Sequence, residues 1–168
     1  MPRDPARPRP DLPPTPGDQR LALAGWLGVI AHFTVVLLAY GELPERIPLH
    51  FDLFGMPDRY GDKVHIWWLV GLGLLLQVGS YWAARHPHTF NYPRRITHEN
   101  ARRQYRNAIR MVRAVTAVTV WAFVYITSAT VRVALGQQDG LGAWFTPLFL
   151  LAVFGTLAVF AYRAVRDT

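Results

Sequence analysis

The chain has 168 residues, of which 51% are hydrophobic and 17% charged, and its formal net charge is +7. Apolar stretches as long as those found here exclude an ordinary soluble domain, in which such runs are rare. The absence of cysteine excludes disulfides and thiolate metal sites.

The first 19 residues form a tail rich in proline and arginine, which we predict to be disordered. Its seven prolines oppose regular helix and sheet hydrogen bonding, and the tail has no apolar cluster on which it could fold. Two interpretations stay open: the tail docks on a partner or on anionic lipid, or it only helps to hold the N-terminus inside the cell.

Four apolar runs follow, and each is close to the roughly 20 residues that a helix needs to cross a hydrocarbon core. They lie at 21–40, 66–84, 112–131 and 143–162. The first run is longer than the apolar part of a typical signal peptide, so we expect a retained span. The sequence therefore predicts an all-α integral membrane bundle of about four transmembrane helices, with one membrane domain over 20–168.

The loop at 42–63, between the first two runs, is not a random linker. Three prolines restrict its backbone and two glycines allow sharp turns. Alternating apolar residues over 47–53 favour a short extended segment with one face packed down. We expect an ordered extracytoplasmic loop that covers the outer mouth of the bundle.

This loop carries the candidate ligand-binding residues, which combine charged, aromatic and turn-forming side chains. They are His50, Phe51, Asp52, Gly55, Pro57, Asp58, Gly61 and Lys63. A histidine among carboxylates can bind a divalent metal or exchange protons, although the spacing matches no specific zinc pattern. Three alternatives stay open: these side chains fix the shape of the loop, bind a peptide or other external ligand, or hold a metal.

Polar residues also occur inside the predicted spans, where we expect them to face the interior of the bundle. His32 lies near the middle of the first run, and Gln77 lies within the second. A stripe on the third run consists of Thr116, Thr119, Thr127 and Thr130. Together these residues could relay protons or bind a ligand, or they could simply form hydrogen bonds between helices.

The connection at 85–113 is strongly basic. We expect a helix that begins with Thr97 as its N-cap and continues into the third span. Four arginines are spaced to share one face of this helix: Arg102, Arg106, Arg110 and Arg113. This face fits attraction to membrane lipid, or the docking of a cytoplasmic protein. We expect no nucleic acid partner. Cytoplasmic loops of membrane proteins are generally rich in Lys and Arg, and this tendency already accounts for the positive charge of the connection.

Fourteen of the 18 Lys and Arg residues lie in the tail, in this connection and after the last run, which four spans place on one side of the membrane. Loops rich in Lys and Arg stay in the cytoplasm. We therefore predict a multi-pass protein of the cytoplasmic (inner) membrane, with the N-terminus and the C-terminus both in the cytoplasm.

The loop from Pro44 to Lys63 also resembles a family signature. Its pattern reads Pro-x-x-Ile-Pro-x-His-Phe-Asp-x-x-Gly-x-Pro-Asp-x-x-Gly-x-Lys. It is similar to a bacterial and archaeal integral membrane domain of unknown function that forms the front half of SdpI-type toxin-immunity proteins. The Phe-Asn-Tyr-Pro run that ends at Pro93 is similar to a second motif of that family. The resemblance implies a membrane module that protects against an envelope toxin and signals inward.

Taken together, these patterns predict a membrane recognition module with no catalytic residues, no cofactor and no metal. Its outer loop would bind an external ligand, such as a peptide toxin or an envelope protein. One alternative is a small transport accessory in which His32 and Gln77 line a path, which would require a homo-oligomer because four spans enclose only a narrow pore. Another is a metal-assisted membrane enzyme that uses His50 and the neighbouring aspartates.

Overall fold

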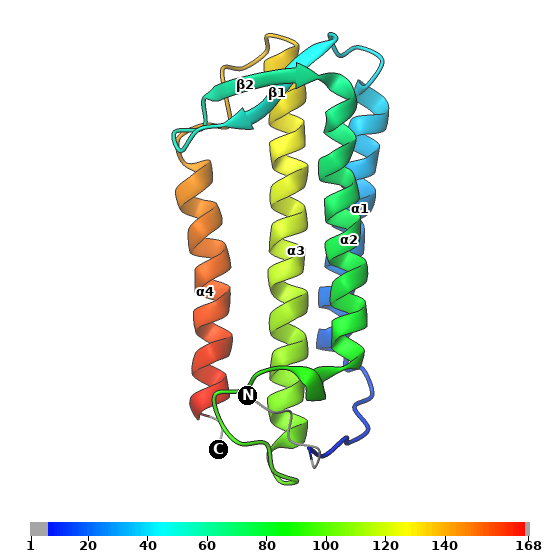
Figure 1. Cartoon of the computed structure of the whole chain (residues 1–168), viewed down its shortest axis with the longest axis vertical. Coiled ribbons are helices and arrows are strands. Elements are labelled where there is room, and N and C mark those ends of the chain that lie inside the picture. The colour runs from blue at the N-terminus through cyan, green and yellow to red at the C-terminus, as the bar shows by residue number, and fades with distance from the viewer. Residues whose placement is uncertain (1–6, 167–168) are drawn as a thin grey trace.

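The computed structural model describes residues 7–166, which form an elongated helical bundle with a small hairpin across one end (Figure 1). Helical residues make up 66% of the chain. The long helices are α1 (Pro16–Ala39), α2 (Ile66–Arg85), α3 (Ala101–Ala134) and α4 (Phe145–Arg166). The short elements are the strands β1 (Arg46–Phe51) and β2 (Pro57–Asp62) and the 3-10 helices η1 (Lys63–His65) and η2 (Pro87–Thr89).

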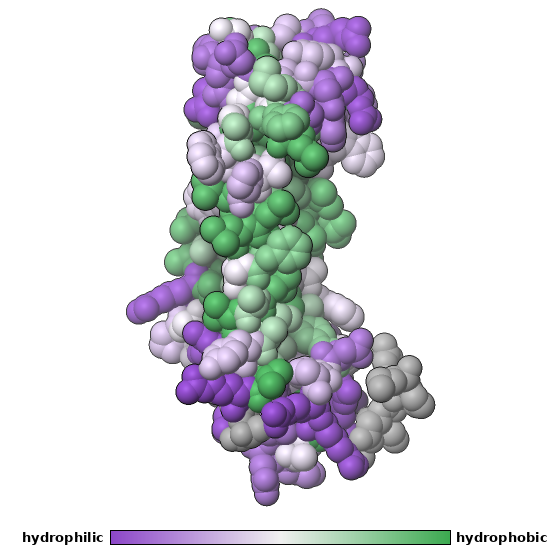
Figure 2. All heavy atoms as spheres, turned by 90° about the vertical axis from the view of Figure 1, so that its left-hand side faces the viewer, coloured by the Kyte–Doolittle hydropathy of each residue, from purple (hydrophilic) through white to green (hydrophobic). Residues whose placement is uncertain are grey.

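The long helices have the dimensions and composition of membrane spans. All four, with η1 counted together with α2, are long and apolar enough to cross a bilayer, which confirms the predicted four-span bundle. Figure 2 shows apolar side chains gathered over the middle of the bundle and polar side chains at both ends. Leu38, Leu75 and Leu151 expose well over half of their surface, as expected for helices that face lipid rather than water.

Helix α3 is the centre of the bundle and contacts α1, α2, α4 and β1. Small residues bring α1 close to its neighbours. A Cβ atom on Gly25 would collide with the side-chain amide of Gln77, and one on Gly28 would lie 2.9 Å from Cγ1 of Val120. Such close approach at small residues is how membrane helices commonly pack, because lipid supplies no hydrophobic force between them.

Helix α4 is attached more loosely than the other three. Among the described residues of α4, only Phe160 is buried. Two side chains of α3 hold the last turns of α4 by hydrogen bonds to backbone carbonyls. Nδ2 of Asn107 donates to the oxygen of Phe160 at 2.8 Å, and Nε2 of Gln104 donates to that of Ala164 at 2.9 Å. Helix α4 is therefore attached to α3 by polar contacts at its last turns, whereas α1 packs on its neighbours through small residues.

Helix α1 begins at Pro16, a few residues before the apolar run. Thr15 caps it: its hydroxyl accepts from the backbone nitrogen of Asp18, whose carboxylate accepts from the backbone nitrogen of Thr15 at 2.8 Å. This reciprocal capping box, with proline at the first helical position, explains the earlier start. Residues 16–19 of the predicted disordered tail are therefore helical, while residues 1–6 lie outside the described part of the chain.

Residues 7–15 form neither helix nor strand, but they contact α3 and η2. Nη1 of Arg7 donates to the carbonyl oxygen of His88 at 3.1 Å. The hydroxyl of Tyr105, a side chain that is only 1% exposed, donates to the carbonyl oxygen of Pro8 at 3.0 Å. This segment therefore crosses the end of the bundle as an N-terminal strap, defined here as residues 7–15.

The start of α3 differs from the prediction. The helix begins at Ala101, and its N-cap is Asn100 rather than Thr97. Thr97 and Asn100 instead close a turn just before the helix. Oδ1 of Asn100 accepts from the backbone nitrogen of Thr97 at 2.9 Å, and the hydroxyl of Thr97 accepts from that of Asn100 at 3.3 Å. The predicted N-cap is therefore wrong by about one helical turn: Thr97 and Asn100 form the same reciprocal pattern as Thr15 and Asp18, but around a turn that precedes the regular helix.

Strands β1 and β2 pair in antiparallel fashion across the other end of the bundle (Figure 1). The sequence predicted only one extended segment here. Leu43 and Ile47 are buried against Val36 of α1, Ile66 of α2 and Val131 of α3, which seats the hairpin on three helices. We call this end, with residues 40–65 and 135–144, the hairpin end. The opposite end, with the N-terminal strap and residues 86–100, is the basic end.

Candidate functional site

The turn of the hairpin is shaped by Asp52. Its Oδ1 accepts from the backbone nitrogens of Phe54 and Met56 at 2.9 and 2.8 Å, and its backbone nitrogen donates to the oxygen of Met56 at 2.8 Å. Gly55 has a φ of +82°, a conformation that favours glycine. Two residues of the motif therefore serve the fold of the turn.

The turn is also fixed to the connection between α3 and α4. The backbone nitrogen of Leu141 donates to the oxygen of Gly55 at 2.7 Å, and the oxygen of Leu141 accepts from the hydroxyl of Tyr125 at 2.7 Å. A side chain at Gly140 would collide with the carbonyl of Gly55. The motif loop and the connection between α3 and α4, which we call the third connection, are thus fixed to each other by a hydrogen bond and close packing.

Among the predicted loop residues, His50 and Asp58 form a close pair of titratable side chains. Nδ1 of His50 lies 2.6 Å from Oδ1 of Asp58, across the two strands, and both side chains are about half exposed. Lys63 lies elsewhere. Its Nζ is 3.1 Å from a carboxylate oxygen of Glu45 and 3.3 Å from the carbonyl oxygen of Leu43.

The eight predicted loop residues are therefore spread along the hairpin and do not converge on a single point. Phe51 and Pro57 are register partners beside the turn, whereas Gly61 pairs with Ile47 near the far end of the strands. Within residues 7–166, no three His, Asp or Glu side chains are grouped closely enough to hold a metal ion. The predicted residues thus lie along an extended surface of the hairpin.

A groove of about 490 Å³ lies beneath β1, between α2 and α3. Its lining is mostly apolar, and it includes Ile66 and Trp68 from α2 and Thr127 from α3. Strand β1 supplies Ile47, Pro48, Leu49 and Phe51. The groove thus runs from the hairpin into the membrane-spanning part of the bundle.

The intramembrane polar residues lie in two places rather than one. Nε2 of His32 lies 2.7 Å from the hydroxyl of Thr127, and His32 is 1% exposed. Its Nδ1 is buried without a hydrogen-bond partner among the described residues. Gln77 instead donates from Nε2 to the carbonyl oxygen of Ala22 at 3.4 Å. Only the histidine is linked, through Thr127, to a residue that lines the groove.

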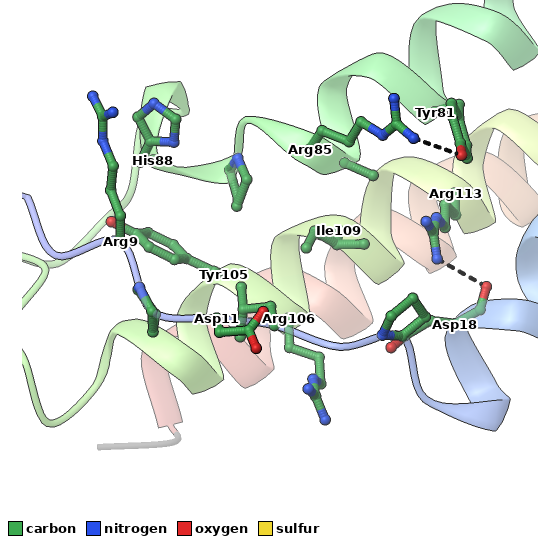
Figure 3. Close-up of a pocket in the computed structure, with 15 residues that line it drawn as sticks. Arg9, Asp11, Asp18, Tyr81, Arg85, His88, Tyr105, Arg106, Ile109 and Arg113 are labelled. Carbon is green, nitrogen blue, oxygen red and sulfur yellow. Dashed lines mark hydrogen bonds between the residues drawn. The ribbon is translucent and has the colours of Figure 1, made fainter.

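Sequence reasoning missed a cavity of about 450 Å³ at the basic end (Figure 3). The N-terminal strap, α2 and α3 all contribute to its walls, with Arg9, Arg85 and Tyr105 among the lining residues. A local signal was present in the sequence, since Thr15-Pro-Gly-Asp18 has the form of a capping box. The contacts that close the cavity join residues far apart in the chain, and no local pattern reveals them.

Comparison with known families gives one match. Residues 27–74 match the family described as a domain of unknown function, DUF1648. The matched segment takes in the second half of α1, the whole hairpin and the first half of α2. Comparisons with curated proteins and with solved structures found no match. The part of the chain that is similar to this family is therefore the part that carries the candidate site.

Proposed function

We propose that the chain is a membrane recognition module, without catalytic activity, whose hairpin end binds a ligand from outside the cell. The observation that carries this proposal is a rigid hairpin with an exposed apolar surface. Hydrogen bonds within the loop fix its shape, yet Leu53 and Phe54 at its tip are 79% and 75% exposed. Trp144, on the neighbouring connection, is 76% exposed. Rigid, exposed apolar groups are typical of binding surfaces.

The chemical class of ligand rests on the surface and on the resemblance together. The apolar tip, with the polar pair His50–Asp58 beside it, suits an amphipathic peptide or a segment of an envelope protein. The similarity of the loop to the front half of SdpI-type immunity proteins supports a peptide toxin. The basic end would then tether a cytoplasmic partner or transmit the signal.

The proposal requires the hairpin end to face the outside and the basic end to lie in the cytoplasm. The distribution of Lys and Arg supports this orientation. The natural chain has no cysteine, so single cysteines can report it directly. In intact cells, a membrane-impermeant thiol reagent should label Arg59→Cys and leave Arg95→Cys unlabelled. The reverse pattern would rule out the proposed orientation.

Photo-crosslinking in native membranes tests the ligand, with a probe at Leu53. A discrete peptide or protein adduct should form with the otherwise natural chain and vanish in His50→Ala/Asp58→Ala. A matched control, Gln137→Ala/Asp139→Ala, changes exposed polar residues at the same end but outside the hairpin and should keep the adduct. If no specific adduct forms with the natural loop in a correctly folded protein, the recognition function is refuted.

A second candidate, a transport accessory, is favoured by one observation. The groove reaches Thr127, whose hydroxyl contacts the buried His32. A polar path would begin at the hairpin and pass this pair, and it would need a homo-oligomer to enclose it. Loss of function in His32→Ala with function retained in His50→Ala would favour transport, and the opposite result would favour recognition.

A further inference from the structure

The cavity at the basic end is enclosed by segments from different parts of the chain. Figure 3 shows Arg9 and Asp11 on the N-terminal strap, Tyr81 and Arg85 on α2, and further basic side chains on α3. The strap is tied in place, since Arg7 donates to the carbonyl oxygen of Phe90 at 2.6 Å. The cavity of about 450 Å³ is therefore part of the fold rather than a gap beside a loose tail.

Positive charge predominates among the side chains that line it. Four arginines, Arg9, Arg85, Arg106 and Arg113, and His88 face two carboxylates, Asp11 and Asp18. Asp18 is already engaged, because its Oδ1 accepts from Nε of Arg110 at 2.7 Å. Asp11 is exposed. The lining therefore has more arginines than carboxylates, and one of the two carboxylates is already paired with an arginine outside the lining.

The bonds that the lining arginines make leave their charges uncompensated. Arg106 donates to the carbonyl oxygen of Pro13 at 3.3 Å, and Arg113 donates to the backbone oxygen of Asp18 at 3.0 Å. Arg85 donates to the hydroxyl of Tyr81 at 2.9 Å. These acceptors are neutral, so each guanidinium keeps its full charge and has donors left for an anion.

His88 reports the resulting positive field. Its pKa is lowered by burial and then by the nearby cations of Arg9, His86 and Arg7.

The position of the cavity indicates where its ligand comes from. Tyr81 and Arg85 belong to the last turns of α2, and the neighbouring Trp82 is 63% exposed. Exposed tryptophan and tyrosine at the end of a span mark the depth of lipid headgroups. A cavity at this depth is open to headgroups of the leaflet in which the basic end lies.

We propose that this cavity binds a phosphate group, and that its source is the headgroup of an anionic membrane lipid. Arg85 and Arg9, the exposed cations at the rim, would bind the phosphate oxygens through their planar, forked donors. The hydroxyl of Tyr81 would donate a further bond once Arg85 turns towards the phosphate. Bound lipid would hold the N-terminal strap against α2 and α3.

The test is a calorimetric titration of the full chain in neutral detergent with dihexanoyl phosphatidylglycerol. The variant Arg9→Gln/Arg85→Gln removes the two rim cations, and Arg94→Gln/Arg102→Gln is the matched control. The control removes the same charge from exposed residues at the same end that do not line the cavity. We expect the rim variant to lose affinity by about tenfold per arginine, because each charge-assisted bond contributes that much. The control should change by less than about twofold.

Equal losses in the two variants would mean diffuse attraction by surface charge and would overturn the site, as would no loss in either. Because both rim arginines are exposed, their replacement should leave the fold intact. Arg85→Lys provides a second reading: it keeps the charge but loses the fork, and it should also bind more weakly. Inorganic phosphate and glycerol 3-phosphate distinguish the sources. If they bind as tightly as the lipid, the phosphate site stands and its assignment to lipid is wrong.

Discussion

The two ends of the bundle use charged residues in opposite ways. At the hairpin end, charged side chains have charged or local partners: His50 pairs with Asp58, and Lys63 with Glu45. At the basic end, arginines mostly donate to backbone carbonyls, as Arg7 does at His88. The first arrangement joins opposite charges at an end where acidic residues outnumber basic ones, whereas the second leaves arginines bonded to neutral acceptors.

This difference is the basis of the two binding proposals, one for each end. A hairpin whose polar groups are satisfied presents its apolar tip as the free surface, which suits a peptide or protein ligand. An end with surplus guanidinium donors suits an anion, which in our proposal is a lipid headgroup. If the two proposals hold, replacing exposed charged residues at either end, such as Asp58 or Arg85, should change ligand binding more than stability. Asp18, which is buried at the basic end, should instead affect stability.

The largest expected effect is that of Asp18→Ala at the basic end. Asp18 is 4% exposed, caps α1 through Thr15 and pairs with Arg110. Its loss removes the capping box and a charge-assisted bond, so the free energy of unfolding should fall by about 2–4 kcal/mol. Unfolding in mixed detergent and sodium dodecyl sulfate, followed by circular dichroism, measures this. A loss below about 1 kcal/mol would show that the capping box and the bond to Arg110 contribute little to folding.

The next effect concerns how the hairpin is anchored. Gly140→Ala should push the connection away from Gly55 and break the bond from Leu141, at a cost of about 1–3 kcal/mol for overpacking. Proteolysis at the hairpin end should accelerate in parallel. Gly41→Ala is the matched control, because a Cβ there would meet no atom within 4 Å. Equal behaviour of the two variants would mean that the hairpin is not held by this contact.

A smaller effect is expected at Thr127, where the groove of the hairpin end reaches the buried histidine. Thr127→Val keeps the shape but leaves both ring nitrogens of His32 without a described partner, which should cost about 1 kcal/mol. Thr34→Val is the control, since that exposed hydroxyl bonds only the carbonyl of Ile30 on its own helix. An unchanged free energy of unfolding in Thr127→Val would indicate that water replaces the lost bond, and so that the groove is wet.

The sequence predicted the helices well because a transmembrane span is a local property of about 20 consecutive residues. It predicted only half of the hairpin. The apolar residues of β1 alternate in the sequence, although in the structure both Ile47 and Pro48 are buried and Leu49 is exposed. Strand β2 is made of exposed and turn-forming residues, and only pairing with β1 defines it as a strand. It also missed the N-terminal strap, since a Pro-rich segment that reaches Tyr105 by one hydrogen bond has no local signature of order.

At the candidate site, too, local patterns were predicted and features that depend on the fold were missed. The motif residues were found, but their spacing did not reveal that Asp52 caps the turn or that Lys63 lies with Glu45, far from His50. Lys63 lies with Glu45 because β1 and β2 pair with Arg46 opposite Asp62, and this register cannot be deduced from the spacing of the motif. The cavity at the basic end depends on contacts between the strap, α2 and α3 and is a property of the fold alone.

The smallest effect on stability is expected for Asp58→Ala, which compares an exposed charged pair at the hairpin end with the partly buried pair at the basic end. Asp58→Ala removes a carboxylate from a bond of 2.6 Å, as short as the bond between Asp18 and Arg110. Its partner and its own side chain are about half exposed, so water can replace the bond, and the cost should be below about 1 kcal/mol. If Asp58→Ala nevertheless abolished the crosslinked adduct, the residue would be retained for the ligand and not for the fold. A loss as large as that of Asp18→Ala, measured in the same detergent series, would instead make the pair a structural element and leave the apolar tip as the only recognition surface of the hairpin.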